Sequence, residues 1–121
     1  MESKPTILIA EDDSSNYLYF SALLHGKYDL LWAKDGGQAV EMALSNDVDV
    51  VLMDYKMPVM SGLEATRKIK QQKPELKVVM QTAYALEDHK QRAILDGVDE
   101  FLTKPVYSST LHEVLDRIIT K

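Results

Sequence analysis

The chain has 121 residues, enough for one domain with a single core and too few for two independent domains, so residues 1–121 are expected to form one unit. A content of 45% hydrophobic and 27% charged residues excludes disordered and fibrous classes, and the lack of cysteine excludes disulfides, thiolate zinc sites and cysteine nucleophiles. The net charge of -5 argues against direct nucleic-acid binding. The sequence has no run of about 20 apolar residues and no signal-peptide-like start, so we expect a cytoplasmic domain with no membrane contact.

Five short apolar runs, rich in β-branched or aromatic residues, predict strands that are separated by longer amphipathic stretches. These runs are Ile7–Ala10, Leu30–Ala33, Val48–Met53, Val78–Met80 and Phe101–Leu102. The runs are continuous and do not alternate apolar with polar residues, which is typical of parallel strands that helices cover on both faces. The sequence therefore predicts an α/β fold of five βα units.

Local signals predict where several helices begin and end. Residues 35–38 (Asp-Gly-Gly-Gln) and 61–64 (Ser-Gly-Leu-Glu) both have the pattern of a capping box, so helices are expected to start near residues 36 and 62. Gly97 is expected to end another helix as a C-terminal cap. A final helix is expected because apolar residues recur at the spacing of one buried stripe. This stripe consists of Leu111, Val114, Leu115 and Ile118.

Five alternating βα units in so short a chain favour a doubly wound sheet, in which ligands bind outside the carboxyl ends of the strands. No glycine-rich phosphate loop follows the first predicted strand, which counts against a nucleotide site. The polar side chains at the strand ends are instead Glu11, Asp12, Asp54, Thr82 and Lys104. In the strand order 2-1-3-4-5, strands one, three, four and five are neighbours, so these side chains are expected to line one crevice.

The acidic residues in this crevice indicate a cation. Clustered carboxylates raise one another's pKa unless a positive charge lies between them. Oxygen ligands alone favour Mg²⁺, which keeps several water ligands and prefers one or two carboxylates together with phosphate oxygens. We therefore expect Mg²⁺ at this edge of the sheet, with phosphate as the missing ligand.

The same residues resemble those of the receiver domain of two-component response regulators. The resemblance spans nearly the whole chain and includes residues 53–58 with Ser61-Gly62, and the closing run 101–105. It implies a flavodoxin-like (βα)5 three-layer sandwich whose five-stranded parallel sheet has the order 2-1-3-4-5. It also implies a phosphoprotein of a phosphorelay and not an enzyme that turns over substrate. Its partner would be a histidine kinase or phosphotransfer domain that carries phosphohistidine.

The resemblance implies how the acidic residues would act. Asp54 would be the phosphoacceptor, a carboxylate nucleophile that forms an aspartyl phosphate. Asp12, Asp54 and the backbone carbonyl of Lys56 would ligate Mg²⁺, and Glu11 would act through metal-bound water. The acidic pair is Glu-Asp where the family pattern has Asp-Asp, a change that is expected to leave the metal site intact.

The resemblance also implies which residues respond to the phosphate. Lys104 would pair with a phosphoryl oxygen, and the Thr82 hydroxyl would move onto the phosphate after transfer. The ring of Phe101, which lacks the hydroxyl of a tyrosine, would turn inward and change the surface of the fourth helix, fifth strand and fifth helix. The resemblance further implies that two copies of the domain could form a homodimer through that surface. Tyr84 resembles a residue that tunes phosphate lifetime, and the Lys104–Pro105 bond is a candidate cis peptide.

Other readings stay open from sequence alone. An aspartate-nucleophile phosphatase also uses an aspartate after a strand with Mg²⁺ and a lysine, but such enzymes place a second acid where this chain has Lys56. A phosphorylation-independent interaction module is disfavoured by the complete set of charged residues. Residues 11–16 and 81–85 resemble receivers of hybrid sensor histidine kinases. The alternatives to that origin are a free-standing single-domain response regulator and, less favoured, a transcription factor.

Overall fold

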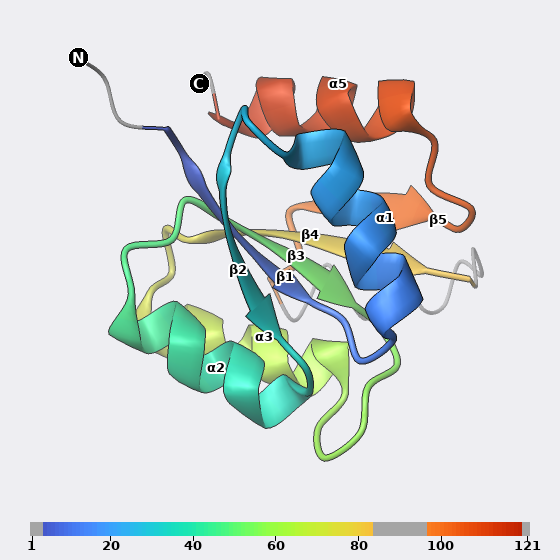
Figure 1. The fold of residues 1–121 in the computed structure, drawn as a ribbon. Helices are drawn as coiled ribbons and strands as arrows, with labels where there is room; N and C mark the ends of the chain where they lie inside the picture. The colour runs from blue at the N-terminus through green and yellow to red at the C-terminus, as the bar shows by residue number, and fades with distance from the viewer. Residues whose placement is uncertain (1–3, 84–96, 120–121) are drawn as a thin grey trace.

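The computed structural model in Figure 1 describes residues 4–83 and 97–119. One parallel sheet has the order β2-β1-β3-β4-β5, and its strands are β1 Thr6–Ala10, β2 Asp29–Ala33, β3 Val50–Asp54, β4 Lys77–Thr82 and β5 Glu100–Thr103. The helices in the described ranges are α1 Ser14–Leu24, α2 Gly36–Ser45, α3 Gly62–Gln72 and α5 Ser108–Ile119. None of these helices combines the length and the apolar character that a bilayer span requires. The predicted flavodoxin-like fold and its strand order are confirmed.

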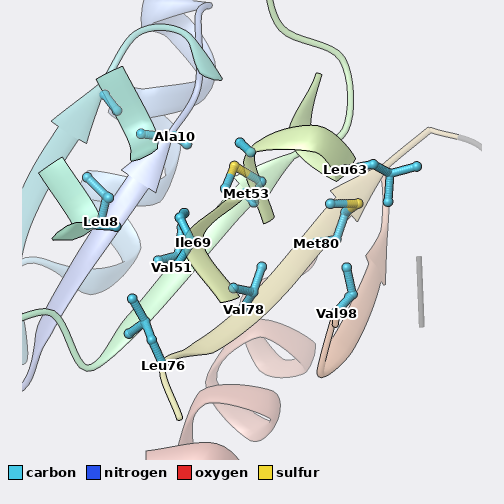
Figure 2. Packing of buried hydrophobic residues seen from close by; sticks show 14 residues of the cluster. Leu8, Ala10, Val51, Met53, Leu63, Ile69, Leu76, Val78, Met80 and Val98 are labelled. Atoms are coloured by element: carbon cyan, nitrogen blue, oxygen red, sulfur yellow. The ribbon is translucent and has the colours of Figure 1, made fainter. Parts of the chain in front are cut away.

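Helices cover both faces of the sheet, with α1 and α5 on one face and α2 and α3 on the other (Figure 1). Successive residues of a strand contribute to opposite cores. Leu8 belongs to the cluster that contains Ile69 of α3, shown in Figure 2, whereas Ile9 belongs to the cluster that contains Phe20 of α1 and Leu115 of α5. This explains why the strand sequences are continuously apolar, because helices cover both faces of the sheet.

Side chains cap the helices that follow the first three strands. The Asp35 carboxylate accepts a hydrogen bond from the backbone N–H of Gln38 at 2.8 Å, and the Ser61 hydroxyl accepts one from the N–H of Glu64 at 3.2 Å. Asp13 caps α1 in the same way. The predicted helix starts near residues 36 and 62 are therefore confirmed, and the connections between strand ends and helices are held in place by these caps.

One predicted strand boundary differs from the structure, and one predicted helix lies outside the described residues. The predicted strand start at Val48 is wrong, since β3 begins at Val50. The Asp49 carboxylate accepts a hydrogen bond from the N–H of Thr6 at 2.7 Å and so occupies the donor that a longer ladder would use. Gly97 has the positive φ of 98° that suits a cap, but the helix expected before it, like Tyr84, lies outside the described residues.

Val59, in the loop between β3 and α3, has a φ of 71°. The residue is 84% exposed, so its packing does little to offset a strained backbone. A β-branched residue in the left-handed region carries a steric cost of about 1–2 kcal/mol. We therefore expect Val59→Gly to raise the free energy of unfolding by about 1 kcal/mol, after the larger backbone entropy of glycine in the unfolded chain is subtracted. Urea denaturation measures this difference. Val59→Ala is the control, because it keeps the Cβ atom at the same φ, and an equal gain in that variant would show that strain is not the cause.

Candidate functional site

Three carboxylates meet at the carboxyl edge of the sheet, as the strand order predicts. Glu11 and Asp12 follow β1, Asp54 ends the neighbouring strand β3, and one carboxylate oxygen from each lies within 4.8 Å of the others. Glu11 and Asp54 are 1% and 4% exposed, whereas Asp12 is exposed to solvent. Two acids are therefore buried under a third that faces the solvent.

The buried position of Glu11 changes its acidity. Burial is the largest cause, and the nearby charge of Asp54 adds to it, so that the pKa of Glu11 rises from 4.5 to about 7. The N–H of Asp13, which donates to Glu11 Oε2 at 3.2 Å, opposes this rise in part. An acid that gives up its proton this reluctantly lacks sufficient positive charge around it. Three oxygen donors with such a deficit fit a hard divalent cation such as Mg²⁺.

Lys104 completes the charged site from the loop after β5. Its Nζ atom lies 3.1 Å from Asp54 Oδ1, and its backbone N–H donates to the carbonyl of Thr82 at 2.8 Å. The Lys104–Pro105 bond is cis, as expected. A cavity of about 110 Å³ lies beside this ion pair. Its walls are formed by Asp54, Tyr55, Lys56, Thr82, Ala83 and Lys104.

The loop after Asp54 is held close behind the carboxylate. The N–H of Gly62 donates to the carbonyl of Tyr55 at 2.9 Å, and a Cβ atom on Gly62 would lie 2.1 Å from the carbonyl oxygen of Asp54. Only glycine fits there without moving the backbone. Lys56 is exposed, and together with Asp12 it lines a wider hollow of about 570 Å³ on the same edge. The fold thus places the Lys56 segment beside the acidic residues.

The two residues expected to respond to a phosphate lie on neighbouring strands. Thr82 ends β4, is 6% exposed and lines the same small cavity as Asp54. Phe101, in β5, is partly buried and packs against the core that faces α2 and α3. The fourth helix of the surface that they would change lies outside the described residues.

Sequence reasoning missed two residues that contact Glu11. Gln81, fully buried in β4, donates from Nε2 to Glu11 Oε1 at 3.3 Å, and the indole N–H of Trp32, in β2, donates to the Glu11 carbonyl at 2.7 Å. The signal for Gln81 was an amide at the end of the otherwise apolar run Val78–Met80. The signal for Trp32 was a single polar N–H within an apolar strand, and the acceptor of that N–H cannot be identified until the fold is known.

The chain matches a family model described as the response regulator receiver domain over residues 7–116. It is 34% identical over 125 residues to hybrid signal transduction histidine kinase I of Dictyostelium discoideum. That match covers 95% of this chain and 7% of the kinase, so the chain spans only a small part of this curated relative.

Two solved structures share the fold over almost the whole chain. The receiver domain of the sensor histidine kinase PA1611 from Pseudomonas aeruginosa PAO1, which has a magnesium ion coordinated in its active-site cleft, is 31% identical with a TM-score of 0.91. The match covers 98% of this chain and 100% of that one. The second structure is the receiver domain of the Saccharomyces cerevisiae response regulator Ssk1, in a co-crystal with the histidine phosphotransfer signaling protein Ypd1. It is 27% identical, with a TM-score of 0.91, and covers 97% of this chain and 90% of that one.

Proposed function

Because this chain belongs to the response regulator receiver domain family, we propose that it is a phosphoacceptor whose Asp54 takes a phosphoryl group from a phosphohistidine on a partner protein. The arrangement around Asp54 is the observation that carries this proposal. Its buried carboxylate lies 3.1 Å from the ammonium of Lys104 on one side and within 4.8 Å of two further acids on the other. One side supplies positive charge for a phosphoryl oxygen, and the other supplies oxygen ligands for a cation.

The cofactor of this proposal is Mg²⁺. Asp12, Asp54 and the backbone carbonyl of Lys56 would ligate it, and Glu11 would act through bound water. The proximity of the three carboxylates and the magnesium ion in the receiver of PA1611 both support this assignment. Bound Mg²⁺ supplies positive charge against the negative charge that develops on the transferring phosphoryl group.

The residues of the chain act on the donor by position and charge. An Asp54 oxygen bonds to phosphorus while the P–N bond of the phosphohistidine breaks and the imidazole nitrogen keeps the electron pair. Lys104 then donates a hydrogen bond to a phosphoryl oxygen, and the Thr82 hydroxyl, which lines the same cavity, donates a second. The phosphoryl group would lie in the cavity of about 110 Å³ beside Asp54, which Thr82 and Lys104 also line.

The proposal extends to partners and to the switch. A phosphotransfer domain is the natural donor, which the co-crystal of the Ssk1 receiver with Ypd1 supports. Residues 1–121 would act as one receiver domain in the cytoplasm. Thr82 and Phe101 would pass the new charge to the surface that contains β5 and α5, where an output partner or a second copy binds.

The parent protein is proposed to be a hybrid sensor histidine kinase. The 34% identity to a hybrid kinase of Dictyostelium discoideum, of which this chain covers 7%, supports that origin. A free-standing response regulator is the alternative. The genomic reading frame distinguishes the two, because a hybrid kinase requires kinase-coding sequence that is continuous with this domain.

Intact-mass analysis tests the proposed function. We expect the wild-type protein with Mg²⁺ and a small-molecule phosphodonor to gain the mass of one phosphate, and peptide mapping to place that phosphate on Asp54. The same incubation with EDTA should give no product. Failure to gain mass in a protein shown to be folded by circular dichroism would contradict the proposal.

Removal of Lys104 separates metal binding from phosphate binding. In Lys104→Ala the positive charge 3.1 Å from Asp54 is lost, so we expect Mg²⁺ to bind roughly fivefold more tightly while the phosphorylation rate falls at least about tenfold. Calorimetric titration and timed intact-mass measurements give the two quantities. The control is Lys70→Ala, which breaks a similar ion pair with Asp99 far from the site and should change neither. Normal phosphorylation of Lys104→Ala would remove Lys104 from the proposed mechanism.

A further inference from the structure

Trp32 is the single tryptophan of the chain, and its indole ring is hydrogen-bonded to the turn after β1, which carries Glu11 and Asp12. Its indole N–H donates to the backbone carbonyl of Glu11 at 2.7 Å. The ring stacks on Tyr17 of α1 with centroids 4.1 Å apart and planes within 6° of parallel, and the Lys34 ammonium lies 4.8 Å from its centre. Trp32 therefore connects edge strand β2 to both the turn after β1 and the first helix.

This attachment matters because the Asp12 carboxylate has no side-chain support of its own. It is exposed, and no residue within the described ranges forms a hydrogen bond or ion pair with it. Its position must come from the backbone of the turn. Within that turn, the N–H of Glu11 donates to the carbonyl of Ala33 at 2.9 Å, and the Glu11 carbonyl accepts from Trp32.

The carbonyl that Trp32 holds belongs to the peptide group that joins Glu11 to Asp12. The orientation of this peptide plane determines the direction in which Asp12 leaves the turn. Its N-terminal side is bonded to strand β2 through Ala33, and its C-terminal side leads into α1, whose cap is Asp13. Two side chains act between these points: the Glu11 carboxylate accepts from the N–H of Asp13 at 3.2 Å, and the indole N–H donates at 2.7 Å directly to the carbonyl of the Glu11–Asp12 peptide and so orients its plane. The stacking on Tyr17 in turn limits rotation of the indole.

We propose that Trp32 is a positioning residue for the metal site, which holds the Glu11–Asp12 peptide so that the exposed Asp12 carboxylate stands opposite the buried Glu11 and Asp54. The inference rests on the proposed function, since it assumes that Asp12 is a Mg²⁺ ligand. Groups that orient metal ligands without touching the metal commonly change metal affinity by tenfold or more when they are removed. Trp32 acts on its ligand through the main chain.

The test is a calorimetric titration with Mg²⁺ alone. Trp32→Phe retains a ring that can stack on Tyr17 but loses the N–H donor, and we expect its Mg²⁺ dissociation constant to rise about tenfold. Tyr17→Phe is the matched control, because it keeps both the stack and the indole donor and should bind Mg²⁺ as the wild type does. Thermal melts of each variant show the temperature range in which it is fully folded, and the titrations are made within it. A residue with a merely structural role would lower the melting temperature and leave the dissociation constant unchanged.

A second variant covers the case in which phenylalanine packs too poorly for the protein to fold. Benzothienylalanine in place of Trp32 has the shape of tryptophan with sulfur where the indole has N–H, and it should weaken Mg²⁺ binding to the same extent. If wild type binds Mg²⁺ and the donor-free variants bind it equally well, the role of Trp32 is overturned while the proposed function stands. If wild type itself fails to bind Mg²⁺, the proposed function falls and this inference falls with it.

Discussion

Replacement of Asp54 by asparagine is expected to abolish phosphorylation and to leave the fold intact. The amide oxygen is a poor nucleophile, and no other acid lies both next to Lys104 and inside the small cavity among the described residues. Intact-mass analysis with Mg²⁺ and a phosphodonor, or with beryllofluoride, should show a product in wild type and none in Asp54→Asn. This is the largest effect on function that the site predicts, a change from complete labelling to none.

The same substitution should raise the stability of the metal-free protein. Asp54 is 4% exposed and its charge adds to the raised pKa of Glu11, so an uncharged side chain relieves repulsion between two buried acids. The substitution also removes the ion pair with Lys104, but this lysine is partly exposed and can be solvated, so we expect a net gain of about 1 kcal/mol in the free energy of unfolding at neutral pH. Asp47→Asn, the same change at an exposed position away from the site, should change neither labelling nor stability. Undiminished acid-labile labelling of Asp54→Asn would show that another residue accepts the phosphate.

The sequence was most informative where one physical constraint acts on a local pattern. The apolar runs had to be continuous because both faces of each strand are covered, and Asp35 and Ser61 had to be polar because they cap helices that start at the next residue. Once strand order is known, Glu11 and Asp54 must lie at the same edge, because they end adjacent parallel strands. These features needed no information about side-chain contacts between distant residues.

The contacts that tune the site were beyond the reach of sequence patterns. Gln81 contacts Glu11 only because β4 lies next to β3, and Trp32 reaches the turn after β1 only because β2 pairs with β1 in the observed register. The true start of β3 was missed for a similar reason, since the Asp49 carboxylate bonds to Thr6 across the sheet. Each of these is a contact between distant segments whose geometry exists only in the folded chain.

The pH dependence of stability gives the second large prediction, and it concerns Glu11. Its pKa rises to about 7 in the folded, metal-free protein, compared with 4.5 for an unperturbed glutamate, so the folded state retains a proton that the unfolded chain releases. The contribution of Glu11 to the free energy of unfolding is therefore greatest below pH 4.5, and it is lost as the pH rises to 7 and above. One pKa unit corresponds to about 1.4 kcal/mol, so a rise from 4.5 to about 7 corresponds to a total loss of about 3–4 kcal/mol.

Urea denaturation in EDTA between pH 5 and 8 measures this loss, and Glu11→Gln should remove most of it, because its amide neither titrates nor repels Asp54. At pH 8 without metal the variant is expected to be more stable than wild type by about 2–3 kcal/mol. Glu41→Gln, on the exposed side of α2, should follow wild type. Added Mg²⁺ should stabilise the wild-type protein most strongly at the alkaline end of this range, where the Glu11 carboxylate is ionised and can act with the cation. The same addition should stabilise Glu11→Gln only slightly, because this variant lacks that carboxylate. A wild-type stability that stays level across this range in EDTA would show that Glu11 ionises normally, and the reason for placing a cation beside it would be lost.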